Sequence, residues 1–392
     1  MSRTDLHSIP AWPGPASYRP GRHRARVAAV AAAASLLLAA AAAGLPAESE
    51  RSGRELYRWA CSSCHGIDGR GAPPSRVGFE VPLPDFTDCE FAVREPDADW
   101  VAVAHDGGPT RGFSELMPAF GGALTVAELE RAVEHVRGFC GDDRWPRGDL
   151  NLPRALVTGK AFPEDEAVFV TTVATDHPGS VTAEVVYEQR FGARNQWEVV
   201  IPVGWRELDP DGDGGWSSGL GDVAVAVKRV LWHDLDRGGI VSAAAEVLLP
   251  TGDRDRGFGS GTTVVEPFLA WGQILPRGLF LQAQAGLGLP ISSDRVEEEA
   301  FARLALGGSI SRGRWGRTFS PMVEVLAARE LTSGADTAWD LVPQVQVTLN
   351  TRQHIMANAG VRIPLDDRDS RSSAVIVYLL WDWFDGGLTE GW

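Results

Sequence analysis

Two cysteines and the histidine that follows them are the residues whose types and spacing best fit a chemical role. They stand in the stretch Cys61-Ser62-Ser63-Cys64-His65. One helical turn between the thiols places both sulfur atoms where they can form thioethers to the two vinyl groups of one porphyrin, and the next residue brings its imidazole under the iron. The motif therefore predicts one covalently attached haem c, with His65 as the proximal ligand of the haem iron.

A zinc half-site and a thioredoxin-like redox pair are the alternative interpretations of two cysteines at this spacing. Zinc needs four ligands, and no second Cys/His pair follows this one at close spacing. A redox pair gives no reason for a histidine directly after Cys64. We therefore favour haem attachment.

Two helices are expected to hold this motif. The stretch 51–60 predicts a helix that runs into the motif, with Gly53 and Tyr57 on one face. A capping box at Thr125 to Glu128 predicts a second helix, and apolar residues follow it at helical spacing: Leu129, Val133, Val136 and Phe139. We expect the two helices to cross where Gly53 allows close approach, although a glycine here could also serve only chain flexibility.

Residues 48–140 resemble the class I cytochrome c family. The resemblance rests on the Gly53/Tyr57 helix, the cysteine motif followed by Gly66, the loop Gly69–Pro74, and Met117-Pro118-Ala119-Phe120-Gly121 before the last helix. It implies a small all-α domain in which Met117 is the distal iron ligand and the carbonyl of Pro73 or Pro74 accepts the N–H of the proximal histidine.

The distal ligand has two candidates. A thioether opposite an imidazole raises the reduction potential and fills the sixth coordination site, which suits outer-sphere electron transfer. Met117 could instead fill a gap in the core. His105, which we expect at the end of a helix containing Trp100 and Val103, is the rival ligand and would give bis-histidine ligation. We favour Met117.

The two remaining cysteines, Cys89 and Cys140, are expected to form a disulfide. An oxidising compartment favours this pairing, which would stabilise a domain with a small core by about 2–4 kcal/mol. Two separately buried thiols are the alternative.

The first 47 residues predict a signal peptide. Arg22, Arg24 and Arg26 precede the small-apolar run 27–43, and alanines up to Ala47 offer cleavage sites. An N-terminal membrane anchor is the alternative, but the run is short for a spanning helix. The full chain has a net charge of −15, and these residues carry five arginines and one aspartate, so the remaining chain is at −19. This charge argues against nucleic acid as a partner and favours basic proteins or cations.

The region after residue 140 predicts a linker and then a β-barrel. Residues 141–166 are rich in proline, aspartate and arginine and read as an ordered linker without repeats. Residues 167–392 contain twelve segments of alternating apolar and polar residues, an even number whose polar face would line a lumen. Their expected starts lie near residues 167, 180, 196, 221, 240, 262, 279, 299, 320, 340, 353 and 373. Polar residues expected to face the lumen are Glu184, Glu188, Glu246, Glu266, Arg303 and Glu324.

We therefore expect an antiparallel transmembrane β-barrel of about twelve strands in the outer membrane. A soluble all-β sandwich is the alternative, because alternation alone does not distinguish a protein core from lipid. The segments Ser218-Gly-Leu-Gly-Asp222 and Leu249-Pro-Thr-Gly-Asp253 resemble motifs of a porin-like outer-membrane family with transport roles.

A haem domain followed by such a barrel resembles the fused cytochrome–porins with which bacteria move electrons across the outer membrane, including those of iron oxidisers. The resemblance implies an electron-transfer protein rather than a substrate-converting enzyme, with its haem domain on or inside the periplasmic mouth. The expected partners are outer-membrane lipid, a periplasmic electron-carrier protein and a small cationic donor such as Fe(II), whose oxidation the chain would support. Two alternatives stay open: a solute-conducting pore with a haem plug, sensor or docking domain, and a soluble periplasmic carrier with a β accessory domain.

Overall fold

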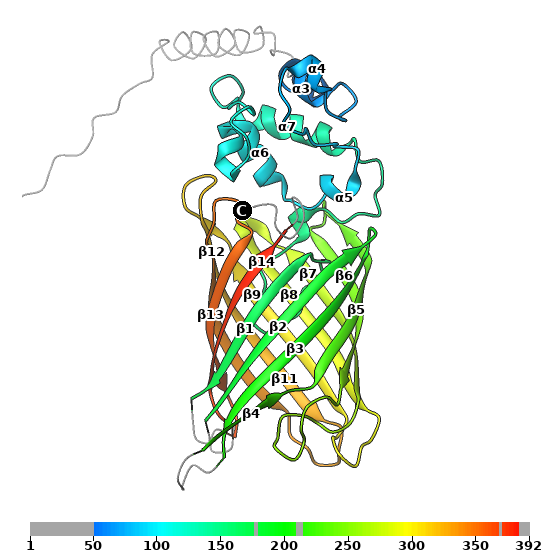
Figure 1. Ribbon diagram of the computed structural model, residues 1–392, viewed down its shortest axis with the longest axis vertical. Coiled ribbons are helices and arrows are strands. Elements are labelled where there is room, and N and C mark those ends of the chain that lie inside the picture. The colour runs from blue at the N-terminus through cyan, green and yellow to red at the C-terminus, as the bar shows by residue number, and fades with distance from the viewer. Residues whose placement is uncertain (1–50, 176–178, 209–214, 368–370, 384–392) are drawn as a thin grey trace, which may run out of the picture. The chain divides into compact units, whose positions relative to one another are not determined.

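The computed structural model describes residues 51–175, 179–208, 215–367 and 371–383, so the predicted signal peptide lies outside the described residues. Helices come first along the chain and strands follow (Figure 1). No helix of the described part is long and apolar enough to cross a membrane.

The N-terminal part of the described chain is a small helical domain. Its helices are α2 (Gly53–Ala60), α3 (Ser62–His65), α4 (Pro74–Val77), α5 (Cys89–Ala92), α6 (Asp97–Asp106), the 3₁₀ turn η1 (Gly108–Arg111) and α7 (Val126–Arg137). The core between them contains Leu56, Val101, Leu129 and Val133, which are almost fully buried. The all-α fold predicted for this region is confirmed.

Helices α2 and α7 cross, as the sequence predicts. Each begins with a capping box, one between Ser52 and Glu55 and the other between Thr125 and Glu128. These boxes satisfy backbone N–H groups that the first helical turn leaves unpaired. At the crossing, a Cβ atom on Gly53 would lie only 2.0 Å from the carbonyl oxygen of Arg131. Glycine is therefore required for close packing here, and the alternative of mere flexibility is not needed.

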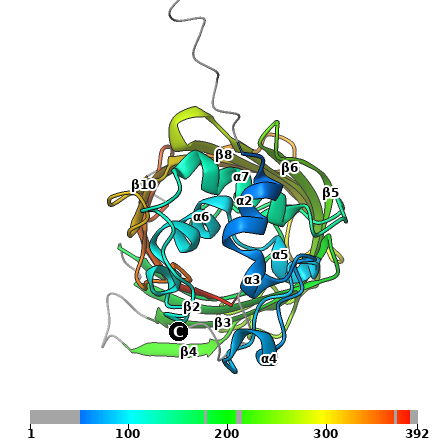
Figure 2. The same cartoon turned by 90° about the horizontal axis from the view of Figure 1, so that it is seen from above.

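The C-terminal part is a closed antiparallel barrel of twelve strands. In order around it are β1 (Glu166–Ala174), β2 (Ser180–Phe191), β3 (Asn195–Glu207), β5 (Val223–Asp234), β6 (Gly239–Leu249), β7 (Val264–Ile274), β8 (Leu279–Pro290), β9 (Glu299–Gly308), β11 (Thr318–Glu330), β12 (Ala338–Thr348), β13 (Ile355–Pro364) and β14 (Ala374–Asp382). The register Glu166↔Asp382 to Ala174↔Ala374 joins β1 to β14 and closes the ring, which is visible end-on in Figure 2. Two short strands lengthen the barrel wall at its ends. They are β4 (Trp216–Leu220), which pairs with β3, and β10 (Ile310–Ser311), which pairs with β11.

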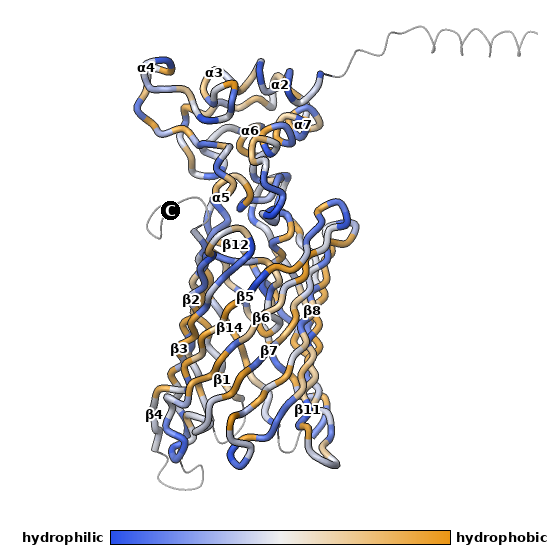
Figure 3. Tube along the Cα trace, turned by 90° about the vertical axis from the view of Figure 1, so that its right-hand side faces the viewer, coloured by the Kyte–Doolittle hydropathy of each residue, from blue (hydrophilic) through white to orange (hydrophobic). Residues whose placement is uncertain are grey.

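The twelve predicted strands are confirmed, and each begins within two residues of its expected start. The barrel also exposes what a soluble protein buries. Val227, Leu269 and Leu379 are 57%, 55% and 50% exposed on the outer surface, whereas Gln196 and Gln282 are each only 1% exposed. Apolar residues recur along the strands of the barrel in Figure 3. An apolar outer face around a polar interior fits lipid and excludes a sandwich with its apolar face buried.

The connections between strands differ at the two ends of the barrel. One end carries residues 192–194, 235–238, 275–278, 309–317 and 349–354, three of which are turns of three or four residues. The other end carries longer connections, among them 208–222 and 250–263. The helical domain contacts the short-turn end. There Arg111 Nη1 donates to the Trp315 carbonyl at 2.8 Å, and Arg194 Nε donates to the Arg144 carbonyl at 3.1 Å.

Replacing Gly53 tests the helix crossing. The change Gly53→Ala should lower the free energy of unfolding of the helical domain by about 1–3 kcal/mol, because the new methyl group would overlap the Arg131 carbonyl oxygen. The matched control Gly122→Ala places its methyl group in open space and should change stability by less than about 0.5 kcal/mol. Denaturant unfolding of the solubilised chain, followed by haem absorption, measures both, and equal stability of the two variants would contradict the assigned packing.

Candidate functional site

A cavity of about 650 Å³ inside the helical domain brings together the residues of the predicted haem site. Cys61, Cys64, His65 and Met117 all line it. The rest of the wall is mainly apolar and includes Phe86, Trp100, Val103, Phe120, Leu124, Leu129 and Val133. A cavity of this size and lining suits a flat, largely apolar cofactor that carries a few polar groups.

The cysteine motif is positioned by the end of one helix and the start of the next. The backbone N–H of Cys61 bonds to the Tyr57 carbonyl at 2.9 Å, so the chain continues from α2 into α3 with both thiols on one turn. Both thiols are free rather than joined to each other. The Tyr57 hydroxyl donates to the Gly66 carbonyl at 2.6 Å and fixes the chain directly after His65.

His65 has the surroundings of an iron ligand. Its ring stacks on Phe86 with 4.9 Å between centroids. Burial lowers the pKa of His65 to about 4, so the imidazole is neutral at physiological pH and keeps a lone pair for a metal. Its Nδ1 atom is buried and has no hydrogen-bond partner among the described residues. The free thiols, the neutral imidazole and the apolar cavity together fit a haem.

The expected bond from His65 to a loop proline does not occur in the structure. The Pro73 carbonyl accepts the backbone N–H groups of Arg76 and Val77, and the Pro74 carbonyl accepts that of Gly78. Both prolines begin the short helix α4, so their carbonyls are engaged by the helix that follows them.

The structure separates the two candidates for the distal ligand. Met117 lines the cavity of His65, and its carbonyl accepts the backbone N–H of Gly108 at 3.0 Å, which holds the loop in place. His105 lies in the last turn of α6, close to the predicted helix end, but its Nδ1 lies 2.5 Å from Asp106 Oδ1 and its ring faces Trp315 in a different pocket. The geometry therefore favours Met117.

Cys89 and Cys140 form the expected disulfide, with 5.0 Å between their Cα atoms. The bond links the start of α5 to the chain just after α7.

Charged residues at one end of the cavity were not expected from the sequence. Glu95, Asp99 and Arg111 come from the helical domain, and Arg352 and His354 from the β12–β13 turn of the barrel. His354 Nε2 lies 2.9 Å from Glu95 Oε1, and Arg111 pairs with Asp99 at 2.6 Å. Burial, followed by the nearby Glu95, raises the pKa of Asp99 to about 6. No sequence signal marks these residues, because two separate parts of the chain supply them.

Part of the predicted linker lies inside the barrel. After the turn η2 (Gly148–Leu150), residues 151–165 run along the inner faces of the strands. Glu324 of β11 accepts the backbone N–H of Val157 at 3.1 Å, and both the N–H and the hydroxyl of Thr158, at 2.6 and 2.5 Å. Further backbone contacts reach Gln196, Ser242, Gln282, Gln284, Gln344 and Tyr378. We call residues 151–165 the plug.

Charged side chains also tie the plug to the barrel wall. Arg154 pairs with Glu166 and lies 3.0 Å from Glu188, while Lys160 Nζ lies 3.7 Å from Glu166 Oε2. Lys228 donates to the Lys160 carbonyl at 3.1 Å. Glu188 and Glu324 therefore face inward as predicted, but they bind the plug instead of lining an open channel. The composition of residues 151–165 suggests a linker and does not reveal these contacts, because the barrel residues that bind the plug lie far away in the sequence.

Two family models match different parts of the chain. One, described as "Cytochrome C oxidase, cbb3-type, subunit III", matches residues 48–136, and the other, described as "Putative MetA-pathway of phenol degradation", matches residues 169–351. No curated protein matches the sequence.

Similar solved structures resemble the barrel. An outer-membrane channel from Pseudomonas putida F1 is 12% identical, with a TM-score of 0.40, over 59% of this chain and 100% of that one. The KdgM porin is 10% identical, with a TM-score of 0.36, over 56% and 99%. The beta domain of the Bordetella autotransporter BrkA is 15% identical, with a TM-score of 0.36, over 56% and 98%.

The first family match and the cavity define a c-type cytochrome domain, and the closed antiparallel sheet with its apolar outer face defines a porin-like barrel. The chain therefore joins a c-type cytochrome domain to a closed, porin-like β-barrel. The fusion expected from the sequence is thus confirmed.

Replacing each candidate distal ligand tests the choice between them. Met117→Leu should lower the midpoint potential and let carbon monoxide bind the reduced haem, because the sixth coordination site loses its thioether. His105→Leu, which alters a residue outside the cavity, should change neither property. Optical redox titration and carbon monoxide difference spectra provide the measurements, and carbon monoxide binding only in the His105 variant would reverse the assignment.

Removing the main acceptor for the plug tests whether it closes the lumen. Glu324→Ala leaves the buried N–H groups of Val157 and Thr158 without their acceptor, at a cost of about 1–3 kcal/mol each, so the plug should loosen and single-channel conductance should rise. Glu330→Ala, at the exposed end of the same strand, should conduct as little as the unaltered chain. Large steady conductance of the unaltered chain would show that the plug does not close the barrel.

Proposed function

We propose that this chain transfers electrons at the outer membrane through one covalently bound haem c. Cys61 and Cys64 would attach the haem, with His65 as the proximal and Met117 as the distal iron ligand. The observation that carries the proposal is that these four residues line one apolar cavity. When bound, haem supplies a one-electron couple between ferric and ferrous iron.

The residues around the cavity support electron transfer rather than oxygen chemistry. A neutral His65 and the thioether of Met117 would fill both axial positions, which leaves no open site for a substrate. Apolar neighbours such as Phe86, Leu124 and Val133 exclude water and favour the less charged, reduced state.

The haem domain would lie at the periplasmic mouth of the barrel. Outer-membrane barrels have short periplasmic turns and longer extracellular loops. The contacts of the helical domain with residues 194, 315 and 354 all involve the short-turn end. A soluble carrier protein could reach the haem domain there. Because residues 48–150 include 19 acidic and 11 basic residues, a basic periplasmic electron carrier would be attracted.

A small cationic donor such as Fe(II) would approach from the extracellular side. Glu246 and Glu266 stand opposite each other on β6 and β7. Glu184, Glu299 and one cation, Arg303, belong to the same charged interior, so acidic residues outnumber basic ones there. Such carboxylates attract cations. The plug would keep the donor out of the periplasm, so electrons rather than ions would pass. This feature favours an electron-transfer role over the alternative of a solute-conducting pore.

Reconstituted liposomes test this proposal. With the haem domain on a known side, Fe(II) added to the opposite compartment should reduce the haem, seen in its absorption bands, without leakage of a trapped ion. The variant Glu246→Gln with Glu266→Gln should slow this reduction, because it removes two lumen carboxylates. The same variant should be reduced normally by dithionite added on the haem side. The proposal would be overturned if Fe(II) in the opposite compartment did not reduce the haem and solutes passed freely. That result would leave a haem-bearing pore.

A further inference from the structure

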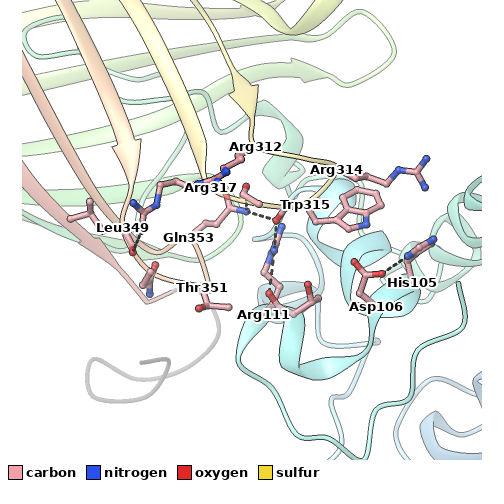
Figure 4. Close-up of a pocket in the computed structure, with 13 residues that line it drawn as sticks. His105, Asp106, Arg111, Arg312, Arg314, Trp315, Arg317, Leu349, Thr351 and Gln353 are labelled. Carbon is pink, nitrogen blue, oxygen red and sulfur yellow. Dashed lines mark hydrogen bonds and ion pairs between the residues drawn. The ribbon is translucent and has the colours of Figure 1, made fainter.

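A second pocket, of about 600 Å³, lies where α6 and η1 meet two turns of the barrel (Figure 4). Four of its lining residues are arginines: Arg111, Arg312, Arg314 and Arg317. The only acidic lining residue is Asp106, which is held 2.5 Å from His105 Nδ1. Although the chain has a net charge of −15, four positively charged side chains meet at this junction. The haem site does not account for this pocket.

The backbone of one turn holds three of these arginines together. Residues 310–311 of β10 pair with residues 318–319, and Arg312 N–H donates to the Arg317 carbonyl at 2.8 Å. The six consecutive residues 312–317 therefore carry three arginines, and all three side chains are exposed: Arg312, Arg314 and Arg317. Arginine side chains on one turn repel one another, and a bound anion would lower that repulsion. Of the three, Arg317 already donates to the Leu349 carbonyl at 3.2 Å, so it is fixed in direction.

The same turn carries a hydrogen-bond donor that lacks an acceptor. The indole Nε1 of Trp315 is buried and has no hydrogen-bond partner in the described residues. The backbone carbonyl of Trp315, by contrast, accepts hydrogen bonds from Arg111 Nη1 at 2.8 Å and from Gln353 Nε2 at 3.4 Å. Figure 4 shows both side chains reaching this carbonyl. An indole N–H can only donate, so a ligand that completes this pocket must bring an acceptor.

We propose that this pocket binds a phosphate group through the guanidinium groups of Arg312, Arg314 and Arg317 and the indole N–H of Trp315. Guanidinium groups bind phosphate in a bidentate manner and hold it more strongly than neutral donors do. A phosphate supplies several acceptor oxygens and negative charge, which are the two features that this turn lacks.

The phosphate could belong to a phospholipid headgroup or to a free phosphate compound. Ile310 and Phe319, which are paired at the base of the turn, are 63% and 42% exposed. If the barrel spans the outer membrane as proposed above, these apolar side chains would lie near the inner leaflet, where headgroup phosphates are close to the arginines.

Calorimetric titration of the full-length, detergent-solubilised holoprotein with inorganic phosphate tests the proposal. We expect saturable binding that becomes at least tenfold weaker in the variant Arg314→Gln with Arg317→Gln. The matched control Arg277→Gln changes an exposed arginine in another short turn, outside the pocket, and should bind as the unaltered chain does. Unchanged haem absorption and heat-modifiable gel mobility would show that each variant is folded.

A second arm distinguishes the two sources of phosphate. In nanodiscs of phosphatidylglycerol, a lipid headgroup in the pocket should abolish phosphate binding, and the double variant should retain less copurified phosphatidylglycerol than the Arg277 control. Undiminished phosphate binding in these nanodiscs would assign the pocket to a free phosphate compound. Absence of saturable phosphate binding in detergent, without loss of copurified lipid in the double variant, would overturn the proposal. Equal phosphate affinity of the double variant and the control would do so as well.

Discussion

The structure depends on hydrogen bonds between inward-facing polar side chains of the barrel and the backbone of the plug. A strand in a membrane barrel must satisfy its own backbone through its neighbours, which leaves its inward side chains free to bind something else. Here Glu324, Gln196, Gln284 and Gln344 each accept a backbone N–H of residues 151–165. Because the chain runs from the helical domain into the plug, these hydrogen bonds also hold the C-terminal end of that domain at the barrel.

This arrangement joins the two halves of the chain in two ways. The plug enters the barrel covalently between the helical domain and β1. At the short-turn end, Arg94 pairs with Asp165 at 3.0 Å, while His354 and Glu95 contact each other across the junction. Buried ion pairs of this kind give limited net stability, but loss of one partner is costly because the other charge stays buried. These contacts join the helical domain to residues at the short-turn end of the barrel.

The placement of the cysteine motif follows from local features of the sequence. The cysteine motif needs one turn of helix, which α2 and α3 provide, and the crossing of α2 over α7 needs the absence of a side chain at position 53. The twelve strands were predictable because the alternation of apolar and polar residues indicates which side chains face the lumen. The alternation does not indicate what occupies the lumen. The outer surface is apolar at alternate positions, and this decided between lipid and a soluble core.

The sequence by itself determined the haem motif, the all-α domain and the strand pattern, since each rests on spacing within a few residues. Only the tertiary structure decided that residues 151–165 form a plug, that Met117 rather than His105 lines the cavity, and that Arg352 and His354 reach it from the barrel. The predicted hydrogen bond from His65 to a proline carbonyl does not form in the described structure. Backbone N–H groups at α4 bond to the carbonyls of Pro73 and Pro74 instead. These features join residues far apart in the chain, and such contacts depend on how the elements pack rather than on any local pattern.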